Sequence, residues 1–166
     1  MDYTRILRHF FTGNLAVRRA FSAASLRAIE QAIKQSETGH DGEIRFAVEA
    51  TLHTLPLFRG LSARERAIEV FSQLRVWDTE RNNGVLIYLL LADRNVEIIA
   101  DRGIHARIGG EGLEKICREM EISFRQGRFE AGVIAGIRSI GSHLQRHFPS
   151  ERQGGENELP DRPVVL

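Results

Sequence analysis

The stretch NNGVLIYLLLADRNVEIIADRGI, residues 82–104, decides the fold of this chain. Residues 85–92 form an apolar run without polar alternation, which is typical of a strand covered on both faces. Residues 93–95, Asp-Arg-Asn, make a good turn sequence, and residues 96–100 form a second extended segment. We therefore predict a central strand over residues 85–92, joined by a tight hairpin to a second strand nearer the edge of the sheet.

A further strand is predicted before this hairpin. Residues 43–50 alternate in polarity, as expected of a strand with one well-buried side. Ser62 and Glu65 then have capping-box spacing at the start of a helix. A strand–helix–strand unit is normally a right-handed crossover between parallel strands, so the strand over residues 43–50 should run parallel to the central strand. The hairpin makes residues 96–100 antiparallel to it.

Three segments with apolar residues at helical spacing begin near Leu26, Leu113 and Phe129. These segments should form helices that cover the sheet. The predicted fold class is α/β: a three-layer α/β/α sandwich with a mixed, mostly parallel sheet and a β-hairpin, plus an N-terminal helical segment. Residues 1–24 form this segment and residues 25–148 the α/β/α domain. Residues 149–166, rich in Gly, Glu and Pro, are predicted to be a disordered tail.

The N-terminal segment carries the apolar residues Phe10, Phe11, Leu15, Val17 and Phe21. We expect it to fold back on the domain; the alternative is an arm for peripheral membrane contact or for a partner. Arginines interrupt its hydrophobic residues, so it reads as neither a secretory signal nor a transmembrane span, and we expect a cytoplasmic protein.

Charge excludes one class of partner. The 166 residues contain 23 basic and 22 acidic side chains, for a formal net charge of +1. Dedicated nucleic-acid binders usually show a strong basic excess, so we expect no nucleic-acid partner.

Two stretches resemble the TPM domain family. Residues 82–104 resemble its pattern "dnGvLllva.dDRkvrI..G.G", and FRQGRFEAGVIAGIRSIG, residues 124–141, resembles its ending "F..G.y..gi..gi..l". The resemblance spans about residues 43–148. It implies an α/β/α sandwich with a mixed sheet, of the kind found in thylakoid-lumen photosystem-repair proteins, nematode receptor-associated proteins and many bacterial proteins. A divalent-metal site and a weak acid phosphatase activity, attributed to some members, are implied as well.

Polar residues should collect at both ends of the sheet. Asp93 lies at the carboxyl end of the central strand, beside the point where Thr51 leaves the parallel strand. Because ligands of open α/β sheets favour this end, Asp93 and Thr51 are the predicted metal site, for weakly bound Mg²⁺ or Ca²⁺. The family often has a second aspartate where this chain has Ala92, which removes one carboxylate. An alternative polar cluster should form at the opposite end from Asp78, Asn82, Asn83 and Asp101.

Glycines at positions 103, 109, 110 and 112 lead into the helix that contains Leu113. The backbone N–H groups at a helix start attract anions, so Arg102 and Arg107 are candidates for an anion-binding site there. His143 and His147 have the spacing of a zinc clamp, but Leu144 stands where the metalloprotease motif requires a glutamate.

Two functions remain open at this stage. The leading hypothesis is a non-enzymatic binding or accessory module with a protein partner, acting in assembly or quality control of a membrane complex. It rests on the family resemblance and on the lack of a converging nucleophile, base and oxyanion site. The alternative is a weak divalent-metal-dependent acid phosphatase that uses Asp93. A second carboxylate close to Asp93 in the folded protein would favour the enzyme.

Overall fold

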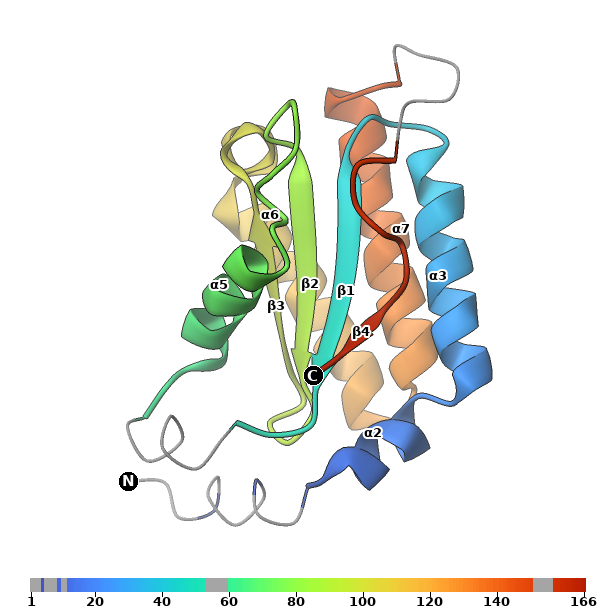
Figure 1. Ribbon diagram of the computed structural model, residues 1–166, viewed down its shortest axis with the longest axis vertical. Helices are drawn as coiled ribbons and strands as arrows, with labels where there is room; N and C mark the ends of the chain where they lie inside the picture. Colours follow the sequence, from blue (N-terminus) through green and yellow to red (C-terminus); the bar gives the residue numbers. More distant parts are fainter. Residues whose placement is uncertain (1–3, 5–8, 10–11, 53–59, 151–156) are drawn as a thin grey trace.

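The computed structural model describes residues 4, 9, 12–52, 60–150 and 157–166 of the chain (Figure 1). In chain order, its described elements are α2 (Asn14–Ala20), α3 (Ala23–Glu37), β1 (Glu43–Glu49), α5 (Ala63–Gln73), β2 (Gly84–Leu90), β3 (Asn95–Ala100), α6 (Arg102–Arg125), α7 (Phe129–His147) and β4 (Val164–Val165).

The described strands form one sheet in the order β3-β2-β1-β4. β1 and β2 are parallel, with Glu43 opposite Gly84 and Glu49 opposite Leu90, as the crossover rule predicts. β3 is antiparallel to β2 and lies at an edge of the sheet. The predicted central strand, the hairpin and the mixed, mostly parallel sheet are therefore confirmed.

Both faces of the sheet are covered. All seven residues of β2 are buried, as its unbroken apolar run predicted. Alternate residues beginning with Val85 belong to the apolar cluster under α3, α6 and α7, and those beginning with Leu86 belong to the cluster under α5. Figure 1 shows these helices on opposite sides of the sheet. The three-layer arrangement is thus confirmed.

β1 is more deeply buried than its alternating sequence predicted. All seven of its residues are buried, including those of the polar face. The Arg66 Nε atom donates to the Glu49 Oε2 atom over 2.9 Å, and the Arg45 Nη1 atom donates to the Arg162 carbonyl oxygen over 3.4 Å. Partners from distant segments therefore cover a face whose polarity suggested exposure to water.

The C-terminal residues 157–166, which we call the strap, lie along the edge of β1 (Figure 1). β4 pairs in parallel with Ala47 and Val48, and Leu159 is buried in the cluster under α5. Without the strap, β1 would present an unpaired edge, and these contacts offset the entropy cost of ordering a polar segment. The predicted disordered tail is therefore wrong for the strap, while residues 151–156 lie outside the described residues.

The N-terminal segment folds back in part, as predicted. Val17 and Phe21 are each 2% exposed, and the Phe21 ring contacts two other phenylalanine rings. Leu15 points into solvent instead, with 60% exposure, and Phe10 and Phe11 lie outside the described residues. Across the part of the chain that the structure describes, no helix is both long enough and apolar enough to span a membrane.

The start of β2 generates a stability prediction. A Cβ atom at Gly84 would lie 1.9 Å from the carbonyl oxygen of Val76, and neither atom can rotate away. We expect Gly84→Ala to lower the free energy of unfolding, measured by urea denaturation, by about 3 kcal/mol, as in severe overpacking. Gly13→Ala, where the new Cβ atom meets nothing within 4 Å and only the N-cap preference of α2 changes, should lower it by no more than about 1 kcal/mol. Equal losses in the two variants would contradict this packing.

Candidate functional site

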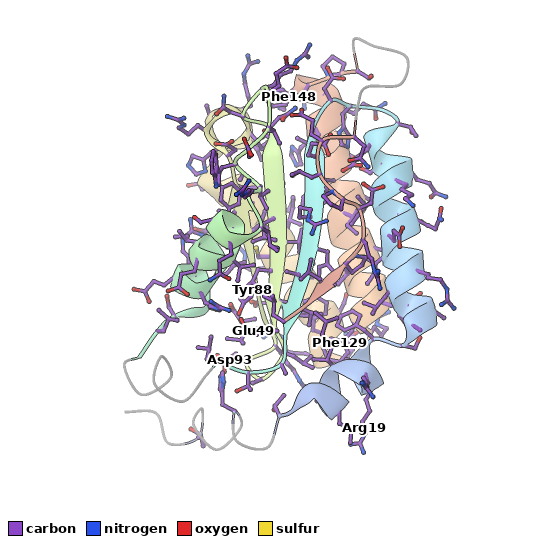
Figure 2. The ribbon with its side chains drawn as sticks, viewed as in Figure 1. Arg19, Glu49, Tyr88, Asp93, Phe129 and Phe148 are labelled. Atoms are coloured by element: carbon purple, nitrogen blue, oxygen red, sulfur yellow. The ribbon has the colours of Figure 1, made fainter. Side chains whose placement is uncertain are left out.

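The carboxyl ends of the parallel strands bring Asp93 and Thr51 into one polar cluster, through a residue that the sequence did not single out. The His9 Nε2 atom lies 3.3 Å from the Asp93 Oδ1 atom. The His9 Nδ1 atom lies 2.7 Å from the Thr51 hydroxyl oxygen. The two predicted residues therefore share His9, and Figure 2 shows Asp93 at the hairpin end of the sheet.

One hydrogen bond sets the proton position on His9. The backbone N–H of Leu52 donates to the His9 Nδ1 atom over 3.1 Å, so this nitrogen is an acceptor. A neutral ring with this acceptor carries its proton on Nε2, the nitrogen that lies 3.3 Å from the Asp93 Oδ1 atom. His9 is 3% exposed, so it joins the N-terminal segment to the ends of β1 and β2 from within the protein.

A groove of about 830 Å³ lies beside this cluster, between α2, the β2–β3 turn and the end of α6. We call it the carboxyl-end groove; it is lined by Thr12, Ala16, Arg19, Ala20, Leu91, Ala92, Asp93, Arg94, Asn95, Glu121, Arg125, Gly127 and Phe129. Figure 2 shows Arg19 and Phe129 at the same end of the molecule as Asp93. Among the described lining residues, three arginines against two carboxylates give the groove a basic character.

Both carboxylates of the carboxyl-end groove are engaged within the protein. The Glu121 Oε1 atom accepts from the Asn95 Nδ2 atom over 3.0 Å and from the Val96 N–H over 3.4 Å. The Asp93 Oδ1 atom lies 3.3 Å from the His9 Nε2 atom. The second carboxylate of the groove thus holds the start of β3 to α6.

A buried brace closes the end of β1 on the α5 side. The Tyr88 hydroxyl donates to the Glu49 Oε2 atom over 2.6 Å, and two Arg66 nitrogens donate to the two oxygens of the same carboxylate. Burial, and then the Glu49 carboxylate, raise the pKa of the Tyr88 phenol above its usual range, so Tyr88 stays a neutral donor. Because every Glu49 oxygen is occupied, we assign this cluster a structural role.

The alternative polar cluster is only partly assembled. A pocket of about 650 Å³ lies at the amino ends of the parallel strands, and Asp78 and Asn83 line it. Asn82 and Asp101 do not line it. Asn82 has a φ of +53°, and its carbonyl oxygen accepts from the Gly103 N–H over 3.2 Å. We call this cavity the amino-end pocket; its carboxylates are Glu37, Asp41, Glu43, Asp78, Glu80, Glu158 and Asp161.

The strap forms one wall of the amino-end pocket. The Glu43 carboxylate accepts from the backbone N–H groups of Glu158 and Leu159 over 3.3 and 3.1 Å. Burial, followed by the Glu43 and Asp161 carboxylates, raises the pKa of Glu37 to about 9. Burial also raises the pKa of Glu43, aided by Glu158 and Asp161. The pocket therefore holds an excess of negative charge. Some of its carboxyl groups keep their protons, which reduces this excess.

The helix start at which an anion site was predicted is capped by a carboxylate of the protein itself. Asp101 is the N-cap of α6, and its Oδ1 atom accepts from the Arg102 N–H over 2.6 Å. α6 begins at Arg102, before all four of these glycines, and kinks at Gly109, which has a φ of +75°. The Arg107 guanidinium lies 5.9 Å from the centre of the Phe148 ring. Arg102 and Arg107 are both exposed. The Asp101 carboxylate, however, already occupies the helix start beside them.

The residues around Asp93 do not fit a ready-made site for Mg²⁺ or Ca²⁺. Such ions take several oxygen ligands, whereas Ala92 offers no side-chain oxygen and the Asp93 Oδ1 atom lies 3.3 Å from a ring nitrogen of His9. Within residues 12–52, 60–150, 157–166 and the two isolated N-terminal positions, no three His, Cys, Asp or Glu side chains are grouped to hold a metal ion.

Several residues of these sites carry no local sequence signal. His9 acts 42 positions away from Thr51, and the Glu49 carboxylate meets an arginine from α5. Glu158 and Asp161 belong to a segment whose composition suggested disorder. Tyr88 is the exception. Its hydroxyl lies inside an apolar run of the sequence, and a buried hydroxyl needs a hydrogen-bond partner.

Known proteins share this architecture. The TPM domain matches residues 18–143. The solution structure of the BA42 protein from the psychrophilic bacterium Bizionia argentinensis is similar, with a TM-score of 0.77, 29% identity and coverage of 88% of this chain and 95% of that chain. The N-terminal domain of a protein from P. gingivalis shares the fold, with a TM-score of 0.64, 18% identity and coverage of 80% and 83%. No curated protein matches the chain.

The buried position of His9 leads to a second prediction. Replacing His9 with alanine leaves the Leu52 N–H and the Asp93 carboxylate without this partner and opens a cavity. We expect His9→Ala to lower the free energy of unfolding by about 1–3 kcal/mol and to speed hydrogen exchange at Leu52. The exposed His105 offers a matched control, and His105→Ala should leave both measurements unchanged. Unchanged exchange at Leu52 in His9→Ala would show that His9 does not hold the N-terminal segment.

Proposed function

Because the chain belongs to the TPM domain family, we propose that it is a non-enzymatic binding module that takes an acidic segment of a protein partner into the carboxyl-end groove. The observation that carries this proposal is the composition of the groove among the described residues. Arg19, Arg94 and Arg125 line it, against Asp93, which lies beside His9, and Glu121, which holds β3 and pairs with Arg125. Guanidinium groups bind carboxylates in a two-pronged geometry, so an acidic segment matches this surface.

Arg94 is the residue of the groove that is best suited to a test. It is exposed and has a φ of +49°, a left-handed conformation that asparagine or glycine adopts at lower cost. Arg75 shares this conformation away from the groove, so the position of Arg94 in the groove lining, and not its backbone, supports a role in binding.

The cellular role that we propose follows from the family resemblance. An accessory module that binds acidic segments can hold a subunit of a membrane complex during assembly or quality control. A volume of about 830 Å³ is within the range of small-ligand sites, so the groove suits a few residues of a partner.

A weak metal-dependent acid phosphatase is the second candidate function. It is favoured by the position of Asp93 at the carboxyl end of the parallel strands, where open α/β sheets bind ligands. The oxygen ligands around Asp93 are few, as described above, so we propose the binding module first.

Arg94 provides a test of the binding module. A photo-crosslinking amino acid in place of Ala16, which lines the groove, should form a discrete adduct with an acidic segment of a partner in cells, identified by mass spectrometry. Arg94→Gly should reduce the yield of this adduct about fivefold, since it removes one ion pair of about 1 kcal/mol. Glycine suits the positive φ, so the fold should persist.

Arg75 supplies the matched control for this experiment. It is also an exposed arginine with a positive φ, +52°, but it does not line the groove. Arg75→Gly should therefore keep the adduct at the original yield. An adduct that survives Arg94→Gly unchanged, or no adduct from Ala16, would contradict the proposal.

A metal titration separates the two candidate functions. We expect Mg²⁺ and Ca²⁺ to bind with a Kd of about 1 mM or weaker, measured by backbone NMR shifts, because few oxygens surround Asp93. Asp93→Ala should weaken this binding more than Asp101→Ala does, and the reverse order would place the ion at the other end of the sheet. Tight binding, together with hydrolysis of para-nitrophenyl phosphate that Asp93→Ala abolishes, would favour the phosphatase.

A further inference from the structure

The amino-end pocket lies at the opposite end of the sheet from the carboxyl-end groove and has the opposite charge. We infer that it binds an aliphatic polyamine, a flexible chain with two or more protonated amino groups. This inference is independent of the function proposed for the carboxyl-end groove.

Charge is the first observation. Among the described residues, seven carboxyl groups line the pocket against the cations Lys34 and Arg81. Both cations are already paired, because the Lys34 Nζ atom lies 2.8 Å from the Glu30 Oε1 atom and the Arg81 Nη1 atom lies 2.6 Å from the Asp41 Oδ2 atom. The negative charge of the pocket is therefore only partly compensated within the protein.

The groups around Glu37 show the same imbalance. Glu43 and Arg45 face it from β1, and Asp161 faces it from the strap. Burial lowers the pKa of His40, which lies between α3 and β1, so this imidazole adds no positive charge near neutral pH. Arg45 is the buried cation that opposes these carboxylates, and burial lowers its pKa as well.

An unsatisfied buried acceptor is the second, independent observation. Asn83 lines the pocket and is 1% exposed. Its Nδ2 atom donates to the Asp41 carbonyl oxygen, and its backbone N–H donates to the Thr79 hydroxyl over 3.1 Å. Its Oδ1 atom has no hydrogen-bond partner among the described residues. Leaving such an oxygen unpaired costs about 1–3 kcal/mol. An ammonium donor would satisfy it once the Asn83 amide turned toward the pocket that the residue lines.

The spread of the carboxylates favours an organic cation over a metal ion. They come from α3, the α3–β1 loop, β1, the α5–β2 loop and the strap, around a cavity of about 650 Å³. A single metal ion needs its ligands within a few ångströms, and the described residues offer no such group of three. A flexible chain with separated ammonium groups can instead reach several carboxylates at once.

The strap makes the site a bridge between two parts of the fold. Glu158 and Asp161 belong to the strap, whereas Asp78 and Glu80 belong to the loop before β2. The Glu158 Oε2 atom already accepts from the Glu80 N–H over 2.8 Å. A bound polyamine would link the same two segments through charge and would hold the strap on β1.

Calorimetric titration with spermidine at pH 7 and low salt tests the inference. We expect saturable binding with one spermidine per chain, and the double variant Glu80→Gln/Glu158→Gln should weaken it at least about fivefold, through the loss of two charge pairs. Glu114→Gln/Glu119→Gln removes two exposed charges from α6 and is the matched control, which should bind like the unaltered protein. Melting curves establish that each variant is folded.

The pH dependence identifies the pocket as the site. Glu37 keeps its proton up to about pH 9, so a polycation must displace that proton to gain its charge. Affinity should therefore rise from pH 6 to pH 8, with protons released into the buffer. Glu37→Gln should reduce this dependence, and Glu43, whose pKa burial also raises, accounts for the remainder. Absence of spermidine binding, equal weakening by the control pair, tighter binding of Mg²⁺ than of spermidine, or a pH dependence that Glu37→Gln leaves unchanged would each overturn the inference.

Discussion

Between Gly84 and Leu90, every side chain of β2 is removed from water, and this burial on both faces determines the arrangement of the other elements. Each face requires an apolar cover, which α3, α6 and α7 supply on one side and α5 on the other. β2 also needs a hydrogen-bonding neighbour on each side, so β1 and β3 flank it. The two ends of β2 are then the places where polar side chains can gather, and both cavities described above lie there.

Patterns of hydrophobicity predicted this scaffold because they report which faces are buried. The unbroken run of β2 and the capping box of α5 were sufficient for the parallel pair, the hairpin and the three layers. The strap was missed for a physical reason. Its main anchors are a carboxylate that accepts two backbone N–H groups and a two-residue strand, and neither leaves a periodic signal in the sequence. The burial of the polar face of β1 was missed for the same reason, since Arg66 and the strap supply the partners of that face.

For the candidate sites, the sequence predicted only what chain direction determines, namely the end of the sheet at which a residue lies. The reversal at the hairpin placed Asp93 at the end of the sheet that carries Thr51, and the structure joins them. Chain direction alone does not reveal which residues share a cluster. His9 enters from a segment 42 residues before Thr51 in the chain, and Asp101, expected in the opposite cluster, caps α6 instead. Such partnerships depend on side-chain geometry, which a single sequence does not encode locally.

The separation of charge along the strands has a consequence for how the two ends can communicate. The chain as a whole is nearly neutral, yet arginines gather in the carboxyl-end groove and carboxylates in the amino-end pocket. A seven-residue parallel strand such as β1 is about 23 Å long, whereas screening in physiological salt reduces charge interactions beyond about 8 Å. A ligand at one end therefore has little direct electrostatic effect on the other. Any coupling between the ends must pass through packed elements, and β1 is the element placed for this, because Glu43 begins it beside the strap and Glu49 ends it at the Arg66–Tyr88 brace.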